Sequence, residues 1–285
     1  MSASQVAILT RGPVFSRYLP GPRVACGVHR RSALQMFLAN TCFVNPPPRP
    51  CWDLGAFRML TECRAAEGNL GGDFFAFRLH GPQRLAVVIG DACGRGKEGA
   101  SLLPGVLSHI EELVVSPVRP SHLLQNLNRG LIGHLPSDRF VTGAAFEIDG
   151  EAGTLTVANA AHVPALLRRA SGEVRIVGRA SGPPLGILED SRYFDETCEF
   201  RSGDVMVLMT DGILEAVETD LQGMPTLTAL VGQGVGSGSA VHRRLLAQLA
   251  AQPSNRDSDD MMLLSLELLA KARKSTLCGG IQAVA

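Results

Sequence analysis

The chain has 285 residues, of which 45% are hydrophobic and 19% are charged, the proportions of an ordinary globular protein. Its 27 basic and 27 acidic residues balance, so no net charge attracts nucleic acid or an acidic membrane surface. Apolar runs fall well short of a membrane-spanning helix, and the seven cysteines form no C-x-x-C pair, so we expect a soluble cytoplasmic protein.

The first 52 residues differ in composition from the rest of the chain. They contain no Asp, Glu or Lys but six Arg, and they end at a proline cluster over residues 46–50. Such a leader is typical of a disordered tail or an organelle transit peptide, and a start codon assigned too early gives the same pattern. We expect residues 1–55 to be a flexible N-terminal extension, with the other two explanations open.

From residue 56 onward, short apolar runs separated by Gly, Pro, Asn and Asp predict strands with helices between them. An antiparallel meander is expected first, over residues 57–64, 74–80 and 84–91. Apolar residues then recur at steps of three and four from Leu103 to Val114, which predicts a helix with Pro104 in its first turn or kinking it. A second amphipathic helix is expected from Pro120 until Gly133.

The second half of the chain returns to strands. They are expected over residues 139–148, 154–158, 165–168, 173–177, 194–200, 204–210 and 260–269, with helices over 212–217 and 240–250. Tight Asp-Gly and Ser-Gly turns favour antiparallel pairing, and 194–200 is expected to pair with 204–210. Strands and helices in blocks predict an α+β sandwich of two antiparallel sheets with helices outside, not a dinucleotide-binding fold.

Several aspartates lie where an apolar strand meets a glycine-containing turn. They are Asp73 after Gly71-Gly72, Asp91 after Gly90, Asp211 before Gly212, and the pair Asp259-Asp260 before the last strand. Charges at the ends of buried strands are costly unless they are paired or bind a metal, and glycine lets a cation approach the backbone. Oxygen ligands without His or Cys select Mg²⁺ or Mn²⁺. Taken singly, each Asp is better explained as a turn residue that caps a strand or helix.

From about residue 56 to 269 the chain resembles the SpoIIE-like branch of the metal-dependent (PPM) protein phosphatases, motif after motif and in the same order. The matching segments are Ala65–Glu67 with Gly71–Phe75, Gly90–Gly96, Phe140–Thr142, Asn159–Pro164, Gly182–Gly186, Gly203-Asp204 with Thr210–Ala216, and Asp259-Asp260. The resemblance implies the PPM fold, a four-layer α-β-β-α sandwich. It places the phosphatase domain at residues 56–272 and a C-terminal tail at residues 273–285.

The resemblance also implies a centre of two Mn²⁺ or Mg²⁺ ions. Its expected ligands are Asp91 bridging both ions, the carbonyl of Ala92, Asp73 on one ion, and Asp211 and Asp259 on the other, with Asp260 as the alternative to Asp259. Asp91 and Asp211 are the expected catalytic residues. Two cations acidify a bridging water, so the implied reaction is hydrolysis of phosphoserine or phosphothreonine by a metal-bridging hydroxide.

The implied substrate is a phosphorylated regulatory protein, in relatives often an anti-sigma-factor antagonist of the STAS type. Three residues depart from the family's pattern: Ala76 replaces a common Asp, Arg95 replaces a His, and Met262 replaces a Thr. None of these positions is an expected core ligand. Ala76 and Met262 nevertheless leave open an alternative function, a weak or inactive pseudophosphatase that acts as a binding or scaffold protein.

Other chemistry-bearing residues have simpler explanations. Asn159 and His162 are expected to order a turn through side-chain hydrogen bonds. Cys93 is expected to be a small buried residue, with a redox-sensitive thiol as the alternative. A P-loop is excluded because Asp91 and Glu98 stand where its first Gly and its Ser or Thr belong. The chain has no G-x-S-x-G motif of a serine hydrolase.

Overall fold

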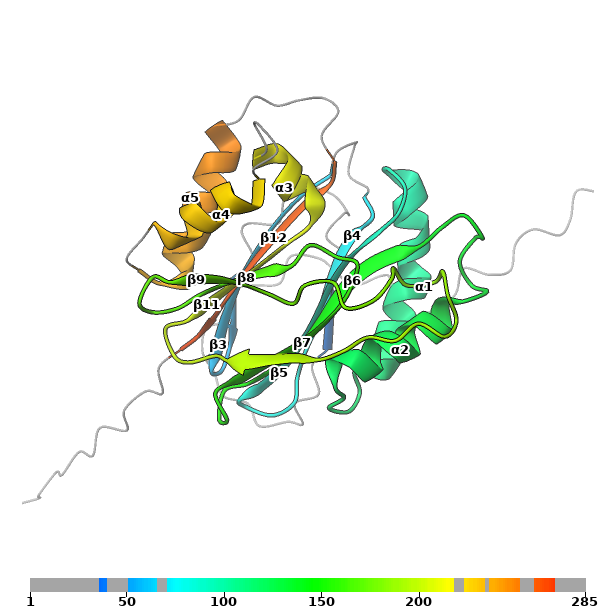
Figure 1. Cartoon of the computed structure of the whole chain (residues 1–285), viewed down its shortest axis with the longest axis horizontal. Coiled ribbons are helices and arrows are strands. Elements are labelled where there is room, and N and C mark those ends of the chain that lie inside the picture. Colours follow the sequence, from blue (N-terminus) through cyan, green and yellow to red (C-terminus); the bar gives the residue numbers. More distant parts are fainter. Residues whose placement is uncertain are drawn as a thin grey trace, which may run out of the picture. The chain divides into compact units, whose positions relative to one another are not determined.

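The computed structural model describes residues 51–65, 71–217, 223–233, 236–251 and 259–269, and the backbone of residues 36–39. All of these residues belong to one compact unit, Leu34–Ala285. Two six-stranded sheets face each other, and helices cover the outer face of each sheet (Figure 1). The predicted α+β sandwich of two antiparallel sheets is confirmed. No helix in the described part of the chain is both long and apolar enough to cross a membrane.

The first sheet has the strand order β1-β4-β5-β6-β7-β10, with every neighbouring pair antiparallel. Its strands are β1 Met36–Ala39, β4 Asp73–Leu79, β5 Arg84–Ala92, β6 Val141–Asp149, β7 Thr154–Ala160 and β10 Glu196–Glu199. Two helices, α1 Lys97–Leu113 and α2 Pro120–Leu131, pack on its outer face. Pro104 is the eighth residue of α1, which excludes the first turn, one of its two predicted alternatives.

The second sheet has the order β2-β3-β12-β11-β8-β9, also antiparallel throughout. Its strands are β2 Cys51–Leu54, β3 Phe57–Arg64, β8 Ala165–Arg168, β9 Val174–Val177, β11 Val205–Met209 and β12 Met261–Leu268. Its outer face packs against α3 Asp211–Val217, α4 Gly223–Gly232 and α5 Gly238–Ala251. The strands β1 and β2 lie upstream of residue 56, and neither they nor α4 were predicted.

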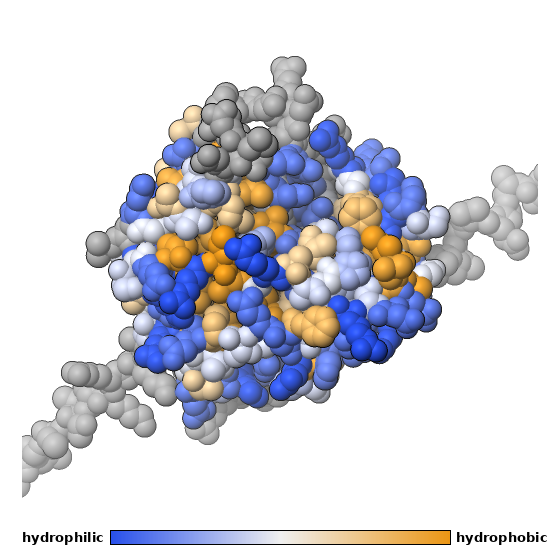
Figure 2. All heavy atoms as spheres, viewed as in Figure 1, coloured by the Kyte–Doolittle hydropathy of each residue, from blue (hydrophilic) through white to orange (hydrophobic). Residues whose placement is uncertain are grey.

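Along a strand, alternate side chains point to opposite faces of the sheet. Both sets are buried because each sheet is covered on both faces. In β4, Phe75 and Phe77 pack between the sheets, whereas Phe74 and Ala76 pack under the helices α1 and α2. This arrangement explains why β4 reads as a continuous apolar run rather than an alternating one. In the face shown in Figure 2, hydrophobic side chains are visible in the middle of the molecule and hydrophilic ones around them.

The predicted meander is wrong in its first strand. β4 and β5 are adjacent, as expected, but β3 lies in the second sheet, where it pairs along its whole length with β12. The partner β12 is therefore about two hundred residues away from β3 in sequence, since Arg64 pairs with Met261 and Phe57 with Leu268. Turn chemistry reports only local pairing, so the sequence pattern could not reveal this partner.

The predicted pairing of residues 194–200 with 204–210 is also wrong. β10 pairs with β7 in the first sheet, and β11 pairs with β12 and β8 in the second. The turn between them therefore carries the chain from one sheet to the other. The turn sequence Arg201-Ser202-Gly203 is compatible with a hairpin. The partners of β11 are decided instead by its burial between β8 and β12.

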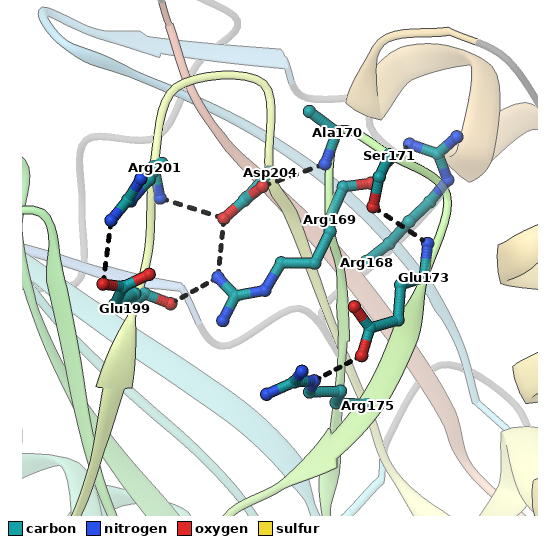
Figure 3. Close-up of polar contacts among 9 residues, drawn as sticks. All are labelled: Arg168, Arg169, Ala170, Ser171, Glu173, Arg175, Glu199, Arg201 and Asp204. Atoms are coloured by element: carbon teal, nitrogen blue, oxygen red, sulfur yellow. Dashed lines mark hydrogen bonds and ion pairs between the residues drawn. The ribbon is translucent and has the colours of Figure 1, made fainter.

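Asp204 fixes this crossing (Figure 3). Asp204 is 3% exposed, and its carboxylate accepts hydrogen bonds from the backbone N–H groups of Arg201 and Ala170, both at 2.9 Å. The guanidinium of Arg169 donates to the same carboxylate at 2.8 Å and to the carbonyl of Glu199 at 2.7 Å. These bonds attach the turn after β10 to the β8–β9 hairpin of the second sheet.

Replacing Asp204 by Ala is expected to lower the free energy of unfolding by about 3–5 kcal/mol, because it leaves the partly buried Arg169 without its ion partner. Arg201→Ala is the matched control. Its ion pair with Glu199 is exposed, so the expected loss is below about 1 kcal/mol. Urea unfolding of both variants measures the difference, and equal losses would contradict this assignment.

Candidate metal centre

The antiparallel pairing brings the predicted carboxylates to one end of the two sheets. Asp73 begins β4 and is the direct cross-strand partner of Asp91, near the end of β5. In the second sheet, Asp211 follows β11, and the pair Asp259-Asp260 immediately precedes β12, the antiparallel neighbour of β11. All five acidic residues named from the sequence therefore converge.

Two hydrogen bonds join the sheets at this end. The backbone N–H of Gly72 donates to Asp260 Oδ2 at 2.8 Å, and the hydroxyl of Thr210 donates to Asp73 Oδ2 at 2.8 Å. Each bond links a residue at the start of β4 to a residue at the β11 or β12 end of the second sheet. Asp73 and Asp260 are both buried residues, at 2% and 4% exposed.

Glycines line the carboxylates because larger residues do not fit. A Cβ on Gly71 would collide with the Asp260 carboxylate, and a Cβ on Gly212 would collide with the Asp260 carbonyl oxygen. A Cβ on Gly72 would collide with the carbonyl oxygen of Ala92 and lie 2.7 Å from Asp91 Oδ1. The carbonyl of Ala92 therefore lies close to the carboxylates, beside Asp91.

Burial and the charges of neighbouring acidic groups raise the pKa values of three of these aspartates. Burial, and then the charge of Asp91, raises the pKa of Asp73 well above its usual range, while the hydrogen bond from Thr210 opposes that rise. Burial, followed by the charges of Asp211 and Asp259, raises the pKa of Asp91 to about 7. Burial and Asp259 raise the pKa of Asp211. In the described part of the chain, no Lys or Arg forms an ion pair with Asp73, Asp91 or Asp211.

Glu215 joins this group of carboxylates. One carboxylate oxygen from each of Asp211, Glu215 and Asp259 lies within 4.8 Å of the others. Glu215 is four residues after Asp211 on α3, so the two side chains share one face of the helix. The resemblance to the phosphatase family placed Glu215 in the matching segment Thr210–Ala216 but not among the expected metal ligands. Its spacing from Asp211 was the signal that could have identified it.

The three departures from the family's pattern lie outside this group of oxygens. Ala76 is buried under α1 and α2, on the face of β4 opposite to Phe75. Met262 is buried between the sheets. Arg95 is exposed in the turn that follows Asp91. None of them replaces one of the converging carboxylates.

Asn159 and His162 order a turn, as predicted. The Asn159 side chain donates to the His162 carbonyl at 2.9 Å and accepts from the His162 N–H at 2.7 Å. These bonds hold Ala161 at a φ of 56°. Burial lowers the pKa of His162 to about 4, so its ring is neutral near pH 7. Cys93 is half-buried, and its Sγ accepts a hydrogen bond from the N–H of Phe140 at 3.1 Å.

The fold matches solved phosphatase domains. The PP2C phosphatase domain of SpoIIE from Bacillus subtilis, solved with a fragment of its regulatory domain, superposes with a TM-score of 0.65 at 18% identity, covering 74% of this chain and 63% of that chain. RsbX, solved in complex with magnesium, has a TM-score of 0.60 at 18% identity and covers 77% of this chain and 99% of its own. The two-sheet sandwich of this protein is therefore the PP2C-type (PPM) fold.

The sequence identifies the family. The family described as stage II sporulation protein E (SpoIIE) matches residues 81–269, more than half of the chain, and the protein belongs to this family. The phosphoserine phosphatase RsbU of Bacillus subtilis (strain 168) is 25% identical over 196 residues, which cover 68% of this chain. The chain spans 56% of the length of RsbU.

The raised pKa of Asp91 predicts how the stability of the metal-free protein depends on pH. The carboxyl binds its proton more tightly in the folded state, with a pKa of about 7, than at its ordinary value of 3.8. The free energy of unfolding should therefore fall as pH rises from about 4 to about 7, with a contribution of at most about 1.4 kcal/mol per pH unit.

Urea unfolding of the metal-free protein between pH 5 and pH 8 measures this slope. Asp91→Asn removes the titrating group and should make the slope shallower, while Asp53→Asn, an exposed residue on β2, is the control. An unchanged slope in Asp91→Asn would contradict the assignment.

Proposed function

We propose that this protein is a metal-dependent phosphatase that hydrolyses phosphoserine or phosphothreonine on a protein. The observation that carries the proposal is the convergence of Asp73, Asp91, Asp211 and Asp259 from both sheets at one end of the fold. Membership of the SpoIIE family and the name of the relative RsbU, a phosphoserine phosphatase, support the same activity.

The chemistry of the side chains fits hard divalent cations. The cluster offers carboxylate and carbonyl oxygens only, which are the ligands that Mg²⁺ and Mn²⁺ prefer. Like charges that raise one another's pKa are stabilised by a cation, and the described residues supply no Lys or Arg for Asp73, Asp91 or Asp211. The magnesium complex of RsbX, a neighbour in fold, supports the choice of metal.

The ligands that we propose for two Mn²⁺ or Mg²⁺ ions come from both sheets. They are Asp73, Asp91 and the carbonyl of Ala92 from the first sheet, and Asp211, Asp259 or Asp260, and Glu215 from the second. When bound, the ions would acidify a water molecule and neutralise charge on the phosphoryl oxygens. Asp91 and Asp211 are the catalytic residues of this proposal, because they come from different sheets and the charge of Asp211, after burial, raises the pKa of Asp91.

The protein's own groups fix the site before a substrate arrives. Asp91 is anchored in the middle of the first sheet, since β5 pairs on both sides. Asp211 accepts a hydrogen bond from the N–H of Gly212 at 3.0 Å, and Asp259 accepts one from Asp260 at 2.8 Å. Because these groups are already oriented, little reorganisation is needed when charge develops on the phosphoryl group.

The proposed substrate is a phosphorylated regulatory protein, by family resemblance an anti-sigma-factor antagonist of the STAS type. We place this reaction in the cytoplasm. The four described cysteines Cys51, Cys63, Cys93 and Cys198 are free thiols, which agrees with a reducing compartment.

The activity test uses the full chain and p-nitrophenyl phosphate with Mn²⁺. Asp91→Asn and Asp211→Asn should each lower the rate by about a hundredfold or more, because each removes charge that holds a cation, a loss of several kcal/mol. Asp53→Asn, on the exposed surface of β2, should retain the parent rate.

Mn²⁺-dependent release that survives both site variants would contradict the proposed site. Mn²⁺ binding measured by calorimetry distinguishes the metal-dependent phosphatase from the alternative, a pseudophosphatase. A protein that binds no Mn²⁺ and releases no phosphate would be the pseudophosphatase, whose role is to bind a partner.

A further inference from the structure

The hydroxyl of Thr210 joins the two sheets at the metal centre. Thr210 lies between β11 and α3 and is 0% exposed. Its Oγ1 accepts a hydrogen bond from the backbone N–H of Met262 at 2.9 Å and donates one to Asp73 Oδ2 at 2.8 Å. One buried side chain therefore contacts β12 in the second sheet and a carboxylate of the first.

The number of hydrogens on these groups determines the direction of each bond. The N–H of Met262 can only donate, so the Thr210 oxygen must accept there. The single hydrogen of the hydroxyl is then left for Asp73. When Asp73 is ionised, its Oδ2 is the acceptor in this arrangement, and the carboxylate cannot rotate without breaking the bond. Oδ1 is the oxygen that remains for another partner.

The backbone of Thr210 is fixed as well. Its N–H donates to the Met262 carbonyl at 3.1 Å, so Thr210 and Met262 are joined by two hydrogen bonds, one through the backbone N–H and one through the side chain. Asp211, the next residue, begins α3. The position of the hydroxyl is therefore set by the same strand ends that carry Asp211 and Asp259.

We propose that Thr210 is a positioning residue, which orients the Asp73 carboxylate for cation binding and links it to the sheet that carries Asp211 and Asp259. The inference rests on the proposed metal-dependent function. Hydrogen bonds that orient a metal-binding side chain are worth roughly 10- to 100-fold in metal affinity. Loss of this one hydroxyl should weaken Mn²⁺ binding by a factor in that range.

The first measurement is calorimetric titration of the metal-free full chain with Mn²⁺. Thr210→Val replaces the hydroxyl by a methyl group of similar size and should weaken binding roughly 10- to 100-fold. Thr210→Ser keeps the hydroxyl and should bind Mn²⁺ like the parent protein. A folded Thr210→Val variant with the parent affinity would overturn the proposal.

Thr61 supplies a matched control. It lies on β3 in the same sheet, is 1% exposed, and its Oγ1 has no hydrogen-bond partner among the described residues. Thr61→Val removes an equally buried hydroxyl away from the carboxylates and should leave the Mn²⁺ affinity unchanged. If Thr61→Val weakens binding as much as Thr210→Val, the effect is one of general packing and the proposal is wrong.

A double-mutant cycle tests whether Thr210 acts through Asp73. Asp73→Asn should weaken Mn²⁺ binding, and adding Thr210→Val to it should cause little further loss, because the group that the hydroxyl orients has changed. A full additional loss in the double variant contradicts the proposal. Should Thr210→Val not fold, Thr210→Ser alone decides: folded protein with weakened binding overturns the proposal, and parent affinity supports it.

Failure of this inference is distinguishable from failure of the proposed function. If Thr210 has no positioning role, Asp91→Asn and Asp211→Asn still lower the Mn²⁺-dependent release of p-nitrophenol by about a hundredfold or more. If the proposed function is wrong, those two variants retain the parent rate whatever Thr210 does.

Discussion

The concentration of carboxylates at one end of the fold is the constraint on which this structure depends. Asp73, Asp91 and Asp211 lie at the junction of two sheets, and burial together with like charge raises the pKa of each. A fold that only needed stability would not concentrate acidic groups there. The surrounding structure tolerates them through close-fitting glycines and through hydrogen bonds that cross between the sheets. Such an unfavourable clustering of like charges is typical of functional sites.

Each sheet supplies a different part of the acidic cluster, and the strand topology determines which part. In the first sheet, β4 and β5 place Asp73 directly opposite Asp91. In the second, the end of β11 and the start of β12 place Asp211 and Asp259 together. Neither sheet holds the complete set of oxygens. The core between the sheets, which includes Phe75 and Phe77, therefore determines the spacing of the chemical groups as well as the stability.

The sequence predicted most of the local structure and the identity of the acidic residues, because both depend on short-range patterns. The strands around Asp91 and Asp211 are apolar runs that end in glycine turns, and such runs are visible without a structure. The partners of β3 and β10 were missed because long-range burial, not turn chemistry, selects them. Glu215 was missed because its approach to Asp259 depends on the pairing of β11 with β12. Thr210 was missed because its hydrogen bond to Asp73 crosses between the sheets.

The crossing held by Asp204 has a consequence for how the chain reaches its native topology. β10 completes the edge of one sheet, and the next strand enters the middle of the other, between β8 and β12. Because β12 is the last strand in the described part of the chain and pairs with β3, the second sheet cannot close until Leu268 has been synthesised. Pairings between distant segments close slowly, since the entropy of long loops is lost before the contacts form. Until then, the edges of β3 and β11 have no partner strand in β12, and their exposed backbone groups are open to mispairing.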